Sequence, residues 1–136
     1  MNTILVVEDE PNQRLLYRME LENEGHRVVL ASQGEEALEK VKEAKPDLVV
    51  LDMRIPVMDG MDFLDRMMEM NTKLPVIIYS AYDGTKDNFG SLSADAYLVK
   101  SSNLDLLKEE IKRILSQRKS EGRWPVWGEN NKKSAI

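Results

Sequence analysis

The sequence predicts an α/β protein built on a doubly wound parallel sheet. Five short apolar runs alternate with segments of helical periodicity along the 136 residues. These runs are mostly Val, Ile and Leu without polar alternation, which is typical of parallel strands that are covered on both faces. The alternating order predicts right-handed crossovers, with helices on both faces of the sheet. We expect the strands at residues 4–7, 26–31, 48–51, 76–79 and 97–99.

Five helices are expected between and after these strands. Pro11 suits a first helical turn and Gly25 suits an end, so the first helix is expected over residues 11–24. Apolar periodicity predicts further helices over residues 34–44, 60–70 and 103–117. The segment 83–94 contains seven poor helix formers, so we expect only a short, easily remodelled helix near residues 85–92; they are Gly84, Thr85, Asp87, Asn88, Gly90, Ser91 and Ser93. The apolar faces of the four stronger helices are expected to be Leu15, Leu16 and Met19; Ala37, Leu38 and Val41; Phe63, Leu64, Met67 and Met68; and Leu104, Leu107, Ile111 and Ile114.

Length and charge indicate one domain with a short tail. We expect the domain at residues 1–118 and a partly disordered tail at 119–136, too short for an output domain. The net charge is −5, but residues 1–117 hold 14 basic and 22 acidic residues, a net of −8. Such an acidic body argues against direct nucleic-acid binding. The chain has no cysteine and no run long enough to span a membrane, so a cytoplasmic protein is expected.

Polar side chains stand where four of the strands end. They are Glu8 and Asp9 after the first strand, Asp52 after the third, Ser80 after the fourth and Lys100 after the fifth. Open α/β sheets bind ligands at the carboxyl ends of their strands, so these residues are expected to lie together in one open site, which we call the mouth. Three neighbouring carboxylates repel, and unless one is protonated they need a hard cation with oxygen ligands. Mg²⁺ fits that need, and no histidine or cysteine is placed to favour zinc.

This set of side chains suits phosphoryl chemistry. A carboxylate bound to such a cation can act as a nucleophile and form an aspartyl phosphate. Lys100 and Ser80 would then contact the phosphoryl oxygens as a point charge and a hydroxyl donor. A single Asp at a strand end is usually a cap or turn former, and a single Lys there is usually solvated. Five such residues together favour a site.

The motifs around these residues resemble the receiver domains of two-component response regulators. The similarity covers about residues 3–117 and rests on residues 6–10, 51–60, 80–81 and 96–100. The resemblance implies the flavodoxin-like strand order 2-1-3-4-5, which chemotaxis receivers share, whereas the residues alone leave the order of the strands open. That order would place the first and third strands side by side.

The resemblance implies a role for each residue of the mouth. Asp52 would accept a phosphoryl group from a histidine kinase or a histidine phosphotransfer protein. The magnesium ligands would be Glu8, Asp9, Asp52 and the backbone carbonyl of Arg54. Ser80 and Lys100 would bind the phosphoryl group. Ser80 and Tyr97 would form a switch that changes the surface of residues 85–92, the fifth strand and the last helix.

Two positions bear on how this site would behave. Ser101 stands where the family usually has a proline after a cis peptide bond, so we expect either a shifted Lys100 after a trans bond or a strained cis bond. Arg54 and Tyr82 lie two positions beyond the phosphoacceptor and the hydroxyl residue. Their bulk is expected to screen the phosphoryl group from water and to give it a long lifetime.

The sequence is compatible with two classes of function. The first is a stand-alone signalling module that catalyses only its own phosphorylation and dephosphorylation and acts on a protein partner, with a phosphorylation-dependent homodimer left open. No membrane partner is expected. The alternative is a Mg²⁺-dependent phosphohydrolase with an aspartyl nucleophile. Such enzymes, by resemblance, carry a second acid two residues after the nucleophile, and here that position is Arg54.

Overall fold

The structure is a computed structural model that describes residues 1–53, 60–70, 73–81 and 94–120. Its strands are β1 (Thr3–Val7), β2 (Arg27–Ala31), β3 (Leu48–Leu51), β4 (Val76–Ser80) and β5 (Ala96–Val99). Its helices are α1 (Pro11–Asn23), α2 (Gly34–Ala44), α3 (Gly60–Glu69) and α5 (Asp105–Ser120). The helix expected at 85–92 lies outside the described residues. None of these four helices is long and apolar enough to cross a membrane.

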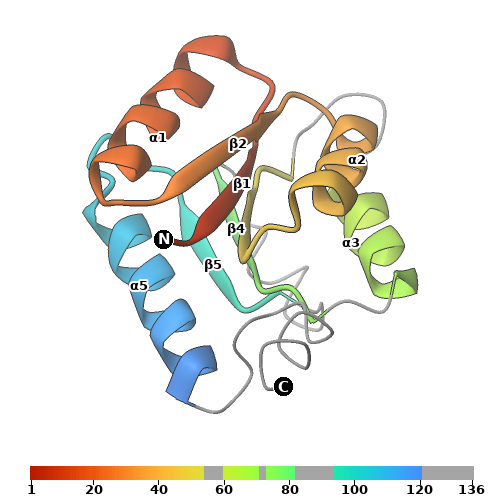
Figure 1. The fold of residues 1–136 in the computed structure, drawn as a ribbon. Helices are drawn as coiled ribbons and strands as arrows, with labels where there is room; N and C mark the ends of the chain where they lie inside the picture. The colour runs from red at the N-terminus through yellow and green to blue at the C-terminus, as the bar shows by residue number, and fades with distance from the viewer. Residues whose placement is uncertain (54–59, 71–72, 82–93, 121–136) are drawn as a thin grey trace.

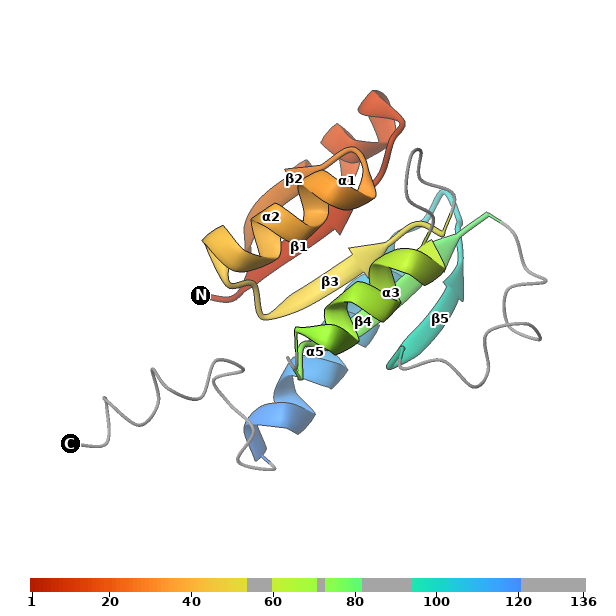
Figure 2. The same cartoon turned by 90° about the vertical axis from the view of Figure 1, so that its right-hand side faces the viewer.

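The five strands form one sheet in the order β2-β1-β3-β4-β5, with every neighbouring pair parallel. Helices α1 and α5 cover one face of the sheet, and α2 and α3 cover the other (Figures 1 and 2). Ile4 and Val50 pack in the core on the side of α1 and α5, whereas Leu5 and Val49 pack on the opposite side. Successive residues of a strand thus enter two separate cores, which explains the continuous apolar runs. The predicted fold class and strand order are confirmed.

The register of the sheet brings the strand ends to one edge. Val7 lies opposite both Ala31 and Leu51, and Ser80 lies opposite Val99. The backbone ladder continues one residue past the strands, because the Asp52 amide donates to the Val7 carbonyl at 3.1 Å. The residues that follow β1 and β3 therefore start from the same level of the sheet. Strands β4 and β5 end together but extend past that level, because Leu51 lies opposite Ile78 and Ile78 lies opposite Tyr97.

Helix α1 turns a different face to the sheet from the one predicted. Leu15, Leu16 and Met19 are 53%, 44% and 67% exposed, so the predicted apolar face was wrong. The buried residues of α1 are Tyr17 and Leu21, which lie one turn apart on a stripe at four-residue spacing. A helix buries only one such stripe against a sheet. Here the aromatic ring of Tyr17 occupies that stripe, since it packs edge-on against Tyr79 of β4 with ring centres 5.7 Å apart.

The other predicted helix faces agree with the structure, with one exception. The four apolar residues predicted for α5 are all buried, and in α2 Ala37 and Val41 are buried while Leu38 packs against the core. In α3, Phe63, Leu64 and Met67 are buried, but Met68 is 61% exposed. Met68 lies about 100° around the helix from Met67, which points it away from the sheet.

Arg118 links the carboxyl-terminal end of α5 to the edge of the sheet at which β4 and β5 begin. This side chain is buried and donates to the Lys73 carbonyl at 2.6 Å and to Asp95 Oδ2 at 3.0 Å. The other carboxylate oxygen of Asp95 accepts from the Val76 amide at 3.1 Å. One guanidinium therefore links α5 to the starts of β4 and β5. The helix accordingly continues to Ser120, past the predicted end at 117.

Arg118→Ala should lower the free energy of unfolding by about 2 kcal/mol, because it leaves a carbonyl and a carboxylate without their charged donor. Arg113→Ala is the matched control on the same helix. Arg113 pairs with Glu110 at an exposed position, and its removal should cost less than about 0.5 kcal/mol. Urea unfolding of both variants measures the difference. Equal losses would show that the buried contacts of Arg118 do not stabilise the fold.

Candidate functional site

Polar residues from four strand ends meet at the carboxyl edge of the sheet. Glu8, Asp52 and Ser80 are buried, with exposed fractions of 2%, 6% and 2%. Asp9 is exposed, so the group opens to solvent on that side. The Lys100 amide donates to the Ser80 carbonyl at 2.8 Å, so the backbone ladder between β4 and β5 continues one residue past β5. This places Lys100 at the same edge of the sheet. The structure thus brings together the five residues that were predicted to share a mouth.

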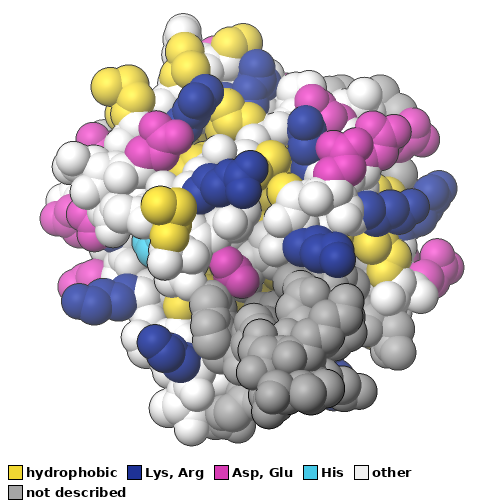
Figure 3. Space-filling view, viewed as in Figure 1, with side chains coloured by type: hydrophobic (Ala, Val, Ile, Leu, Met, Phe, Trp, Pro, Cys, Tyr) yellow, Lys and Arg dark blue, Asp and Glu magenta, His cyan; other side chains and the backbone are white. Residues whose placement is uncertain are grey.

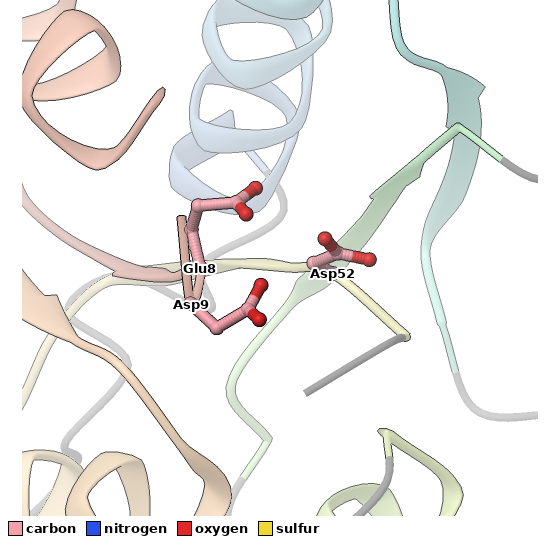
Figure 4. Close-up of side chains that lie close together, drawn as sticks. All are labelled: Glu8, Asp9 and Asp52. Atoms are coloured by element: carbon pink, nitrogen blue, oxygen red, sulfur yellow. The ribbon is translucent and has the colours of Figure 1, made fainter. Parts of the chain in front are cut away.

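The three acids lie close enough to share one cation. Glu8, Asp9 and Asp52 each offer a carboxylate oxygen within 4.8 Å of the others. Figure 4 shows the three carboxylates converging from the ends of β1 and β3. Like charges at this range repel strongly at a partly buried site. The arrangement therefore needs positive charge nearby or a proton on one of the acids.

Lys100 supplies positive charge to two of these acids. Its Nζ lies 2.6 Å from Glu8 Oε1 and 2.9 Å from Asp52 Oδ2, and its side chain is only 15% exposed. Burial alone would lower the pKa of Lys100, but the hydrogen bonds and charges of Glu8 and Asp52 outweigh it and raise that pKa above 10.5. The ammonium is therefore charged at neutral pH. It stays at the carboxylates although Ser101 replaces the usual proline.

Glu8 is the acid that resists ionisation. Burial raises its pKa above 4.5, and the charge of Asp52 acts in the same direction. Hydrogen bonds from Lys100 and from the Glu10 amide, which donates to Glu8 Oε2 at 3.2 Å, oppose this shift without cancelling it. A further cation would favour the ionised form of Glu8.

The turn between β1 and α1 is shaped by residues that the sequence pattern did not single out. The Arg14 guanidinium donates to the backbone carbonyls of Glu8 and Asp9 at 3.0 and 3.1 Å. The Glu10 carboxylate accepts from the backbone N–H groups of Asn12 and Gln13 and so caps α1. An acid just before Pro11 is a helix-start signal that could have identified Glu10.

Gln13 was also missed, although it contacts the site directly. Its Oε1 accepts from Lys100 Nζ at 2.9 Å and from the Tyr17 hydroxyl at 3.0 Å. Burial raises the pKa of Tyr17 to about 12, so this hydroxyl keeps its proton. Gln13, Tyr17 and Leu21 follow one another at four-residue spacing. A search for that stripe, instead of the denser leucines, would have placed Gln13 over the strand ends.

Two predicted switch residues occupy different settings. Ser80 is buried at the end of β4, the strand that neighbours β3, which Asp52 follows. Tyr97 packs against the core on the side of α2 and α3. Its hydroxyl is buried and has no hydrogen-bond partner among the described residues. Arg54 and Tyr82, the other predicted residues of the site, lie outside the described residues.

The donor set fits Mg²⁺. Glu8, Asp9 and Asp52 provide only oxygen ligands, which a hard cation prefers, and the exposed position of Asp9 leaves room for waters. The ammonium of Lys100 already bridges Glu8 and Asp52, which shows that this pair is arranged around positive charge. The three acids are the residues that would hold the ion.

The parallel α/β sheet, with an acidic edge and one bridging lysine, agrees with the resemblance to receiver domains. The chain belongs to the response regulator receiver domain family, which it matches over residues 4–112. It is 37% identical over 120 residues to the alkaline phosphatase synthesis transcriptional regulatory protein PhoP of Bacillus subtilis (strain 168), covering 87% of this chain and 49% of that protein. The chain spans about half the length of PhoP and of the mycobacterial regulators TcrX and TrcR, 49%, 49% and 44%.

Other relatives are covered almost completely. The chain is 36% identical over 115 residues to sporulation initiation phosphotransferase F of Bacillus subtilis (strain 168), covering 82% of this chain and 92% of that protein. The crystal structure of the response regulator TrrA from Thermotoga maritima with Mg²⁺-BeF matches with a TM-score of 0.78 at 40% identity, covering 83% of this chain and 98% of that one. TrrA in complex with the histidine kinase ThkA matches equally, with a TM-score of 0.78 at 40% identity over 85% of this chain and 99% of that one.

Tyr97→Phe should raise the free energy of unfolding by about 1 kcal/mol, since it removes a buried hydroxyl without a partner among the described residues. Tyr79→Phe is the matched change on the neighbouring strand. The Tyr79 hydroxyl bonds to the Ser101 backbone at 3.3 Å, so its loss should lower stability by about 0.5–1 kcal/mol. Urea unfolding compares the two variants. Destabilisation by Tyr97→Phe would show that its hydroxyl finds a partner in solution.

Glu8→Gln should raise the free energy of unfolding in EDTA near neutral pH. Burial raises the folded-state pKa of Glu8 above 4.5, so the folded protein binds this proton more readily than the unfolded chain. The contribution of Glu8 to the free energy of unfolding therefore falls as the pH rises from 4.5 through the raised pKa. The gain of Glu8→Gln should shrink as pH is lowered toward 4.5. Urea unfolding over that range measures it, and a gain independent of pH would refute burial as the dominant cause.

Proposed function

We propose that this protein accepts a phosphoryl group on Asp52 from a histidine kinase or a histidine phosphotransfer protein, with Mg²⁺ held by Glu8, Asp9 and Asp52. The proposal rests above all on one observation: the Asp52 carboxylate lies between two further acids and a lysine ammonium 2.9 Å away. The complex of the similar protein TrrA with a histidine kinase supports the choice of donor.

In the proposed step, an oxygen of the Asp52 carboxylate attacks the phosphorus of a phosphohistidine. A P–O bond forms, the P–N bond breaks, and the imidazole nitrogen keeps the electron pair of the broken bond. Lys100 would exchange a carboxylate partner for a phosphoryl oxygen as that group arrives. Bound Mg²⁺ would supply positive charge for the phosphoryl oxygens. Asp9, exposed at the mouth, would let a donor side chain reach the site.

The exposed face of α1 suits the docking of that donor. Leu15, Leu16 and Met19 are all more than two-fifths exposed, and α1 starts two residues after Asp9. Figure 3 shows hydrophobic side chains gathered on the surface over α1. An apolar surface next to the reactive carboxylate offers a partner protein contact area close to its phosphohistidine.

We further propose a signalling role instead of turnover of phosphate esters. Arg54 occupies the position where the alternative phosphohydrolase would carry its second acid. An arginine has no carboxylate with which to protonate a leaving group or activate water. This chain covers 98% of the solved TrrA chain and 92% of sporulation initiation phosphotransferase F, and these two relatives support a module that acts through a protein partner.

The phosphoryl group would change the surface through Ser80 and Tyr97. A phosphoryl group adds close to two negative charges and three acceptor oxygens, which would draw the Ser80 hydroxyl toward Asp52. The Tyr97 hydroxyl has no partner among the described residues, so its present position is unfavourable and a small shift can change it. A population shift of this kind requires a few kcal/mol.

Incubation with Mg²⁺ and acetyl phosphate should add one phosphoryl group to the wild type, as measured by intact mass. Asp52→Asn should remain unmodified, since an amide is not a nucleophile of this kind. EDTA should prevent the reaction by removing the cation. An adduct that persists in Asp52→Asn places the acceptor elsewhere, and absence of any adduct in wild type overturns the proposal. Steady hydrolysis of p-nitrophenyl phosphate would instead favour the phosphohydrolase.

A further inference from the structure

The ammonium of Lys100 uses all three of its hydrogen-bond donors. Glu8 Oε1 accepts at 2.6 Å, Asp52 Oδ2 at 2.9 Å and Gln13 Oε1 at 2.9 Å. Two of these acceptors are acids that the proposed function assigns to Mg²⁺. The third is a neutral amide that a cation does not need. When Mg²⁺ takes up the acids, Gln13 is the partner that Lys100 can keep.

The amide of Gln13 is held in the orientation that this contact needs. Its Oε1 accepts from Lys100 and also from the Tyr17 hydroxyl at 3.0 Å. The ammonium can only donate, so the amide must present its oxygen and not its nitrogen at this point. Tyr17 is itself buried and packs edge-on against Tyr79. Gln13 therefore presents an acceptor that is fixed before any ligand binds.

The backbone of Ser101, the residue after Lys100, is also held by a buried side chain. The Tyr79 hydroxyl accepts from the Ser101 amide and donates to the Ser101 carbonyl, both at 3.3 Å. A proline at position 101 has no N–H and could not make the first of these bonds. The ring contact between Tyr17 and Tyr79 connects the two supports, one at the backbone next to Lys100 and one at its ammonium.

We propose that Gln13 is a positioning residue that retains the Lys100 ammonium beside Asp52 when a divalent cation occupies the three acids. The inference rests on the proposed function for the identity of that cation. Without Gln13, a lysine displaced from Glu8 and Asp52 has no protein acceptor among its present partners, so displacement is harder. Gln13 therefore assists cation binding indirectly, through the lysine that competes for the same carboxylates.

Titration of the full chain with Mg²⁺ alone, by calorimetry and without a phosphoryl donor, tests this inference. Gln13→Met keeps the length of the side chain and removes the acceptor. It should weaken Mg²⁺ binding by up to about fivefold, the contribution of one hydrogen bond, because Lys100 then keeps two acceptors in the free protein but none once the cation takes the acids. Asn12→Met is the matched control, because Asn12 is exposed on the same helical turn and should leave the affinity unchanged. Lys100→Met should tighten Mg²⁺ binding by removing the competing ammonium.

The double variant Gln13→Met/Lys100→Met decides between positioning and a structural effect. If Gln13 acts through Lys100, the double variant binds Mg²⁺ as tightly as Lys100→Met alone. A fivefold loss that persists in the Lys100→Met background overturns the inference, as does unchanged or tighter binding by Gln13→Met. If the wild type binds Mg²⁺ but acetyl phosphate leaves Asp52 unmodified, the proposed function fails while this titration still decides the role of Gln13.

Discussion

The ion pairs of Lys100 with Glu8 and Asp52 are the interaction on which the carboxyl edge of the sheet depends. Two carboxylates within 4.8 Å repel by roughly 3–4 kcal/mol at an effective dielectric constant of about 20. Glu8 and Asp52 are also both buried, so water does little to reduce that repulsion. Lys100, which is 92 residues from Glu8 and 48 residues from Asp52 in the sequence, offsets this repulsion. The parallel sheet makes the pairing possible because β5, which is separated from β1 by β3 and β4, ends level with β4 at the same edge.

Strand periodicity and strand-end chemistry made much of this edge predictable. Uninterrupted runs such as 48–51 identified strands buried on both faces, and a parallel sheet places such ends together. Asp52 and Lys100 followed from position alone, before any contact was known. The strand order was different in kind: nothing in the residues decides which strand lies beside β1, and it had to be taken from similar proteins.

The buried face of α1 and the contacts of Gln13 were missed for one physical reason. Counting apolar residues favours Leu15, Leu16 and Met19, whereas the sheet accepts the stripe of Gln13, Tyr17 and Leu21. A tyrosine there can be buried because its hydroxyl bonds to Gln13 and its ring packs against Tyr79. Both partners are supplied by the fold, so local hydrophobicity could not reveal that the less apolar stripe would be inside.

The inner and outer faces of helix α1 consequently differ in their contacts. Its inner stripe reaches Lys100 through Gln13 and rests on β4 through Tyr17, while its outer face exposes Leu15, Leu16 and Met19. Its first turn is tied to the acids, since Arg14 donates to the carbonyls of Glu8 and Asp9. A hydrogen-bonded helix transmits a displacement along its length better than a loop does. A protein that docked on the outer face would therefore contact the same helix that holds the lysine and the acidic turn, so the proposed docking face and the proposed phosphoryl site share one structural support.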